Sequence, residues 1–220
     1  MKILAIDTSG RSAGVAVVEN GAVLCTRIVS AMGEGADASQ PVAALPGNWK
    51  HSQRLLPAIQ QMMQDAAITM GDIGAVAYTN GPGSFTGLRI GAATALGLAR
   101  GCNIPVVAVP TLDAMAYTGI IMRAAPRAVA MLDARRGQVY AAIYQRDEGS
   151  NMPTRITDYL ADAEESVHAL AGDALVIRDD VDPAAVGLWA AANFHQAREA
   201  SQAEEVLYVR APQAVRERNA

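Results

Sequence analysis

The fold of this chain is decided by the stretch Ala75-Val-Ala-Tyr-Thr-Asn80-Gly-Pro-Gly-Ser-Phe85-Thr-Gly-Leu-Arg89. The run from Ala75 to Thr79 is short and largely apolar, which predicts a buried strand. An alanine-rich apolar stretch then continues to Arg100 and predicts a helix, which Gly101 ends in the left-handed conformation. A second strand is predicted over residues 104–109. Strand, helix and strand in this order predict a βαβ unit with parallel strands and a right-handed crossover, and hence an α/β fold.

The turn between the first strand and the helix is rich in glycine and places backbone N–H groups beside a helix N-terminus. Such a turn can contact phosphate, and the residues in position to do so are Asp7, Thr8, Gly81, Gly83 and Ser84. The alternative is a tight turn whose glycines let the helix pack closely, with Asp7 bonding to nearby backbone groups. Because the sequence has neither a P-loop nor a dinucleotide-binding fingerprint, the residues alone favour the tight turn.

Two predicted helices have faces that suit close packing. On the helix after the turn, small residues recur every four positions, at Gly87, Gly91, Ala95 and Ala99. Another backbone can approach such a stripe closely, so it packs either on the chain's own sheet or against a partner. An earlier helix, predicted over residues 51–68, has a broad apolar stripe that includes Leu55, Leu56, Ile59, Met62 and Met63. Its residues alone favour a core helix, which starts or kinks at Pro57.

The two halves of the chain share a pattern of strand, aspartate, polar loop and strand. In the first half, strands over 3–6 and 13–18 flank Asp7, and Asn20-Gly21 predicts a hairpin to a third strand over 22–29. In the second half, strands over 128–132 and 139–144 flank Asp133. The remaining predictions are a long surface loop over 30–50, helices over 158–170 and 183–198, and a strand over 174–177.

The composition favours a globular protein and argues against a general nucleic-acid binder. The chain has 220 residues, 51% of them hydrophobic, which suffices for a sizeable core. A formal net charge of −4 does not suit a protein that grips RNA over a broad surface. Cys25 and Cys102 are expected to be buried free thiols, as in a reducing compartment. With no signal peptide and no apolar run long enough to cross a bilayer, we expect a soluble, cytoplasmic protein without membrane contact.

Three segments of the sequence resemble a known family. They are Ile6-Asp7-Thr8-Ser9, the block Asn80-Gly-Pro-Gly-Ser-Phe-Thr-Gly-Leu-Arg-Ile-Gly91, and Asp133-Ala-Arg135-Arg136-Gly-Gln-Val-Tyr140. Together they resemble the bacterial TsaB (YeaZ-like) family, the non-catalytic partners of TsaD in the threonylcarbamoyl-adenosine (t6A) modification of tRNA. The similarity is dense over residues 1–145 and thin beyond them.

The resemblance implies an actin/hexokinase-like (ASKHA) fold with two ribonuclease-H-like lobes, the second of them reduced. We place the first lobe, with the dimerisation helices, at residues 1–109, and the second at 110–220, with a last helix that crosses back to the first lobe. The resemblance also implies that the helices over 51–68 and 85–100 form the partner and dimer interface. The interface residues are then Leu55, Leu56, Ile59, Met62, Met63, Gly87, Arg89, Gly91 and Ala95.

The same comparison implies that this chain lacks the catalytic metal of its relatives. TsaD has a His-x-x-x-His metal pair, and the matching positions here are Thr111 and Met115. A hydroxyl and a thioether suit a hard catalytic metal poorly, so we expect no metal and no catalysis by this chain. We also expect no cofactor of its own, with a nucleotide at the subunit interface as a weaker alternative.

The expected function is therefore that of a scaffold. The chain would dimerise with TsaD and recruit TsaE for threonylcarbamoylation of adenosine 37 in ANN-decoding tRNAs, would meet tRNA only through that complex, and would form a homodimer when alone. The alternative is an ASKHA-type ATPase or small-molecule kinase that uses Asp7 and the Gly81–Gly83 turn for phosphate. Arg135 and Arg136, on the second hairpin, either meet RNA or an acidic partner or belong to a solvated turn.

Overall fold

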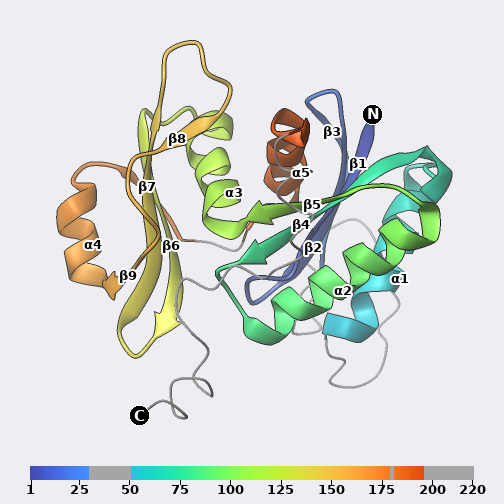
Figure 1. Cartoon of the computed structure of the whole chain (residues 1–220), viewed down its shortest axis with the longest axis horizontal. Coiled ribbons are helices and arrows are strands. Elements are labelled where there is room, and N and C mark those ends of the chain that lie inside the picture. Colours follow the sequence, from blue (N-terminus) through green and yellow to red (C-terminus); the bar gives the residue numbers. More distant parts are fainter. Residues whose placement is uncertain (30–50, 179–180, 196–220) are drawn as a thin grey trace.

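The computed structural model describes residues 1–29, 51–178 and 181–195 of the chain. These residues form two five-stranded sheets with helices between them and on both outer faces (Figure 1). The expected loop over 30–50 and the chain beyond residue 195 lie outside the described residues.

The first sheet has the strand order β3-β2-β1-β4-β5. Its strands are β1 (Lys2–Asp7), β2 (Ala13–Glu19), β3 (Ala22–Val29), β4 (Ile73–Gly81) and β5 (Val106–Pro110). The first three form an antiparallel meander, whose Asn20-Gly21 turn has positive φ at both residues, as a two-residue hairpin of this type requires. Since β4 pairs with β1 and β5 in parallel, the predicted βαβ unit is confirmed.

Helices α1 (His51–Asp65) and α2 (Phe85–Cys102) cover one face of this sheet, and the short η1 (Met70–Asp72) leads into β4. Two predicted boundaries were wrong. Helix α1 runs through Pro57 and ends before Ile68, and α2 continues past Gly101 to Asn103, which takes the left-handed conformation with a φ of 53°. Asparagine tolerates that conformation better than most residues, so it can replace glycine at the helix end.

The second sheet has the order β10-β6-β7-β8, with β9 also paired to β7. Its strands are β6 (Arg127–Arg135), β7 (Gln138–Arg146), β8 (Pro153–Arg155), β9 (Leu160–Ala163) and β10 (Leu175–Ile177). Helix α4 (Glu164–Ala171) packs on its outer face (Figure 1). The helix predicted over 158–170 was therefore too long, because its first residues pair with β7 as a strand.

Two helical segments lie between the sheets. They are α3 (Thr111–Tyr117), which continues into the π-helix η2 (Thr118–Met122), and α5 (Pro183–Ala192). One continuous apolar core joins them to the facing sides of both sheets. Helix α5 packs against β1 and β2, where a Cβ on Gly187 would lie 2.9 Å from each γ-methyl of Val18. The chain thus returns to the first sheet after the second is complete.

This arrangement is an actin/hexokinase-like α/β fold with a smaller second lobe, as predicted. The first sheet ends at Pro110 and the second begins at Arg127. The division of the chain at residue 109 stays a prediction.

Candidate functional site

The carboxyl ends of β1 and β4 are joined by a buried hydrogen-bond network around Asp7. Its Oδ1 accepts from the Ser9 backbone N–H at 3.1 Å, from the Ser9 hydroxyl at 2.6 Å and from the Thr79 hydroxyl at 2.7 Å. The Asp7 side chain is buried, as are Thr8 and Ser9. A carboxylate held by three donors fixes the loop that follows β1.

The glycine-rich turn packs directly on this loop. The Ser84 N–H donates to the Ser9 carbonyl at 2.7 Å, and the Ser84 hydroxyl caps α2 by accepting from the Gly87 N–H at 3.2 Å. The Thr8 hydroxyl donates to the Gly87 carbonyl at 2.7 Å. At Gly83 a Cβ would lie 2.6 Å from the Ser9 carbonyl oxygen, so this close approach requires glycine.

The five residues predicted to contact phosphate are therefore brought together at one junction. Asp7 and Thr8 are buried, Gly81 is buried, and the Ser84 hydroxyl caps its own helix. These contacts support the tight-turn interpretation, and the phosphate role stays a prediction.

The small-residue stripe of α2 faces the interior of the chain. Gly87, Gly91, Ala95 and Ala99 are all buried, and side chains on Gly87 and Gly91 would collide with Thr8. Of the two alternatives, packing on the chain's own sheet is thus the one observed. Gly87, Gly91 and Ala95 were wrongly chosen as surface residues for a partner to touch, because the close approach that they allow is used by β1.

The apolar stripe of α1 divides in the same way. Leu55, Ile59, Met62 and Met63 are buried in the core beneath the helix, whereas Leu56 is 51% exposed. Leu55 and Met62 are at most 2% exposed, so they too were wrongly chosen as partner contacts. Among the predicted interface residues, Leu56 and Arg89 have exposed side chains.

A shallow apolar groove runs along the outer surface of α1 and α2, which we call the α1–α2 groove. It has a volume of about 300 Å³ and is lined by Leu56, Ile59, Gln60, Met63, Gln64, Ile68, Met70 and Leu98. At the start of α2, the Arg89 guanidinium stacks over the Phe85 ring at 3.9 Å from its centroid. The sequence analysis missed Gln60 and Gln64, although their spacing of four from Leu56 places the three on one helix face.

Between the sheets, Asp113 of α3 is a largely buried carboxylate held by two tyrosines. Its Oδ1 accepts from the Tyr144 hydroxyl at 2.6 Å and from the Tyr159 hydroxyl at 2.9 Å. Burial raises the pKa of Asp113, and the two hydroxyl donors lower it. Burial and the neighbouring Asp113 raise the pKa of Tyr144 and of Tyr159, so both hydroxyls keep their protons. The Arg155 guanidinium lies 3.9 Å from the centre of the Tyr159 ring and extends the cluster to the surface.

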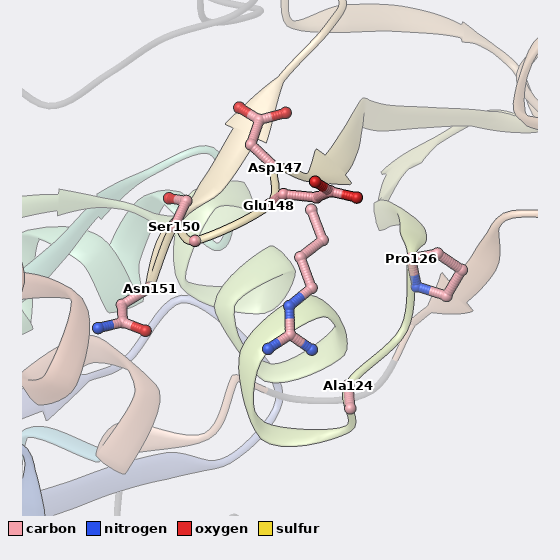
Figure 2. A pocket seen from close by; sticks show the side chains of 8 residues that line it. Ala124, Pro126, Asp147, Glu148, Ser150 and Asn151 are labelled. Carbon is pink, nitrogen blue, oxygen red and sulfur yellow. The ribbon is translucent and has the colours of Figure 1, made fainter.

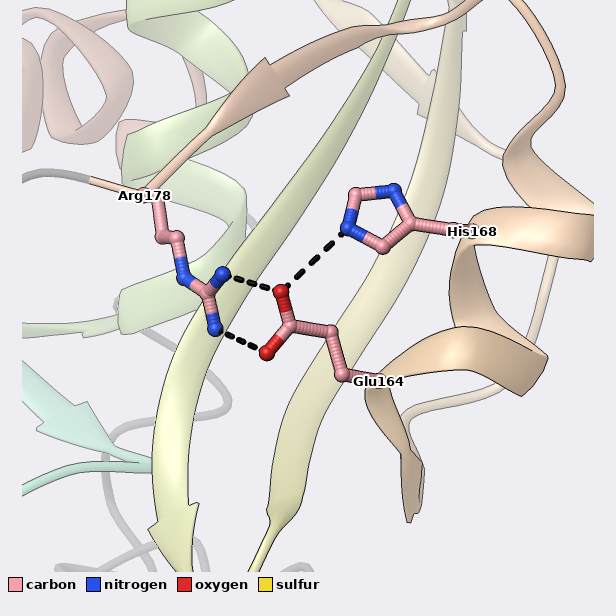
Figure 3. A network of polar contacts seen from close by, with 3 residues as sticks. All are labelled: Glu164, His168 and Arg178. Atoms are coloured by element: carbon pink, nitrogen blue, oxygen red, sulfur yellow. Dashed lines mark hydrogen bonds and ion pairs between the residues drawn. The ribbon is translucent and has the colours of Figure 1, made fainter.

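Two further polar features lie on the second sheet. A cavity of about 320 Å³ opens beside the β7–β8 loop, lined by Ala124, Pro126 and residues 146–151 (Figure 2). At the other edge, the Arg178 guanidinium pairs with both carboxylate oxygens of Glu164, and His168 approaches the same carboxylate at 3.3 Å (Figure 3). The hydrogen bonds from Arg178 lower the pKa of Glu164. These groups satisfy one another and suggest no chemistry.

Thr111 and Met115, at the positions of the TsaD histidines, lie one turn apart on α3 and are buried. Within the described residues, no group of three or more His, Cys, Asp and Glu side chains is placed to hold a metal ion. Both cysteines are free, but Cys102 is exposed, contrary to prediction. Cys25 is half-buried, which raises the pKa of its thiol. None of the described helices is long and apolar enough to cross a membrane.

The internal pattern of strand and aspartate is also present in the structure. Asp133 Oδ1 accepts from the backbone N–H of Arg135, two residues on, at 2.7 Å. Asp7 makes the same contact to Ser9. Both aspartates therefore shape the turn after a strand of their own sheet, one of them buried and the other exposed.

The comparisons with known proteins agree with this geometry. Residues 9–175 match the family model for TsaD, tRNA N6-adenosine threonylcarbamoyltransferase. The tRNA threonylcarbamoyladenosine biosynthesis protein TsaB of Escherichia coli (strain K12) is 40% identical over 153 residues, which are 67% of this chain and 57% of that protein. Its counterpart in Bacillus subtilis (strain 168) is 34% identical over 154 residues, 68% of this chain and 57% of that protein. The matched part thus spans little more than half the length of these curated relatives.

A solved structure shares the fold over nearly the whole length. YeaZ from Pseudomonas aeruginosa superposes with a TM-score of 0.69 at 24% sequence identity, covering 94% of this chain and 99% of that one. Together with the family match and the curated relatives, this shows that the chain belongs to the family described by the TsaD model and, within it, to the TsaB family.

Proposed function

We propose that the chain is the non-catalytic subunit of a tRNA-modifying assembly, and that the α1–α2 groove is its docking surface for the catalytic relative TsaD. The relatives that it matches are described as tRNA threonylcarbamoyladenosine biosynthesis proteins. In this assembly the chain acts as a scaffold for threonylcarbamoylation of adenosine 37 in ANN-decoding tRNAs, TsaE joins the assembled pair, and tRNA is met through the complex. Without TsaD, the same surface holds two copies of the chain together.

The observation that carries the proposal is the character of the α1–α2 groove. Its floor is made by Ile59 and Met63, and Leu56 and Leu98 stand at its sides. Helix α2 has no acidic residue, and the one acidic residue of α1, Asp65, pairs with Arg27 at 2.6 Å. An apolar surface with few charges at its centre is what a stable protein interface requires. The methionine at its floor can adapt to a partner's side chains.

The chemistry is proposed to belong to the partner. The positions that match the TsaD metal ligands hold a buried hydroxyl and a buried thioether, Thr111 and Met115. Oxygen and nitrogen ligands suit a hard catalytic metal, and a thioether does not. The polar groups of the Asp7 network are already bonded to one another, so they support a structural junction rather than a phosphate site.

The test is reconstitution of tRNA modification from purified components, using the organism's own TsaD and TsaE and omitting each protein in turn. We expect modification only when this chain and TsaD are both present, and none by this chain alone. Modification or ATP turnover by the isolated chain would contradict the proposal and favour the ATPase or kinase alternative.

A further inference from the structure

The tip of the β6–β7 hairpin has an unusual backbone for its residues. Arg135, Arg136 and Gly137 are three consecutive residues with positive φ, at 65°, 58° and 73°. Residues with a side chain pay roughly 1–2 kcal/mol to enter the left-handed region, and glycine pays nothing. Positive φ at Arg136 and Gly137, between the paired residues Arg135 and Gln138, is the requirement of a type I′ turn.

The first sheet has a hairpin of the same kind, which serves as an internal comparison. There the paired residues Glu19 and Ala22 flank Asn20 and Gly21, with φ of 51° and 80°. Asparagine followed by glycine is the pair that such a turn prefers. Arg136 occupies the position of Asn20, so the second hairpin uses a residue that its own backbone disfavours. The turn geometry therefore does not explain the arginine.

Packing and ion pairs do not explain it either. Arg135 and Arg136 are exposed, and neither pairs with a carboxylate among the residues that the structure describes. The hairpin is held instead by Asp133, through the Arg135 backbone N–H. The nearby Arg178 is engaged with Glu164 (Figure 3), so it does not compete for a ligand at the tip.

From these observations we propose that Arg135 and Arg136 contact the phosphate backbone of the tRNA substrate when the chain is assembled with TsaD; this inference rests on the proposed function. Two adjacent guanidiniums on a projecting turn suit phosphate, which is recognised by charge and hydrogen bonds without burial. A protein partner is the less suitable occupant, because the tip, from Asp133 to Gln138, has no large apolar side chain for the core of an interface.

The inference separates two roles of the same residues. A structural role predicts that the arginines stabilise the hairpin, whereas a phosphate-binding role predicts that they are kept at a cost to it. Asparagine at both positions removes the charges and suits the left-handed backbone better. The variant Arg135→Asn/Arg136→Asn should therefore keep or raise the melting temperature and still weaken binding to tRNA.

The experiment measures binding of the assembled complex to a tRNA transcript between about 50 and 200 mM salt. We expect the double variant to assemble with TsaD normally and to lower the slope of log affinity against log salt by about 2, one for each phosphate contact. A matched control is Arg127→Gln/Arg146→Gln, which removes the same charge from the opposite end of the same two strands. The control should keep the wild-type slope.

Each other outcome overturns the inference. An unchanged slope means that the arginines do not touch RNA, and a lower melting temperature means that they serve the hairpin. Weaker binding to TsaD or TsaE with an unchanged slope means that the tip meets an acidic protein surface. Failure of the wild-type chain to assemble with TsaD contradicts the proposed function as well, whereas intact assembly with an unchanged slope contradicts this inference alone.

Discussion

Gly91 and Gly97 lie on opposite sides of α2 and should respond in opposite directions to the same substitution. A Cβ on Gly91 would collide with the Thr8 side chain, while a Cβ on Gly97 meets nothing within 4 Å. Gly91→Ala should therefore cost about 1–3 kcal/mol of stability, as overpacking does. Gly97→Ala should add roughly 0.5–1 kcal/mol through helix propensity. Urea unfolding of both variants gives the comparison, and equal stabilities would contradict the inward placement of the stripe.

The buried Asp113 should make stability depend on pH in a defined direction. Because burial raises its pKa in the folded chain, its contribution is fully present below the unfolded pKa of about 3.9 and is lost as the pH rises through the folded value. Asp113→Asn keeps an oxygen that accepts from Tyr144 and Tyr159 but cannot ionise.

We expect Asp113→Asn to gain stability over the wild type as the pH rises, by about 1.4 kcal/mol for each unit by which the pKa is raised. Urea unfolding at several values from about pH 4 to pH 7 measures the difference. A difference that stays constant with pH would show that Asp113 is not responsible.

At the scale of residues, sequence patterns located the important groups better than they assigned their contacts. Asp7, Thr8 and the glycines of the turn were placed together correctly, because strand ends and turn residues have strong local signals. The facing of the small stripe on α2 was left open, since small residues suit a sheet and a partner helix equally well. The contact between Gly91 and Thr8 joins residues far apart in the sequence, so no local pattern revealed it.

At the scale of elements, α5 should be sensitive to its close approach to the first sheet. Gly187 faces both γ-methyls of Val18, and the helix here joins the packing of the two sheets. We expect Gly187→Ala to cost about 1–3 kcal/mol, because the added methyl pushes α5 away from β2. Ala192→Ser, at the exposed end of the same helix, should stay within about 0.5 kcal/mol of wild type. Thermal or urea unfolding distinguishes them; similar losses in both variants would contradict this packing.

The elements of the first sheet were more predictable than those after Gly149. Strands β1 to β5 are short apolar runs bounded by clear turn signals, so pattern and structure agree. Residues 160–163 have a composition that suits a helix, yet they pair with β7. Tertiary pairing overrides weak local preference in such segments. The end of α2 was misplaced for a related reason, because Gly101 tolerates the helix and Asn103 tolerates the left-handed turn.

At the scale of the whole molecule, the sequence indicated two related halves but not how they meet. The repeated strand and aspartate were visible in the sequence, and both aspartates make the same contact two residues on. The layer between the sheets depends on α5 returning to β1 and β2 after the second sheet is complete. Such a return is a property of the chain path, which residue periodicity does not encode. The resemblance to the TsaB family supplied that part of the prediction.

The central claim is that the α1–α2 groove docks on TsaD, and the most direct measurement is the affinity between the two purified proteins by calorimetry. Leu56→Asp places a charge in the groove, which docking would have to bury, so we expect affinity to fall at least about tenfold, or about 1.4 kcal/mol. Leu24→Asp makes the same change at a similarly exposed leucine on β3 and should bind like wild type. Equal affinity of Leu56→Asp and wild type for TsaD would contradict the account.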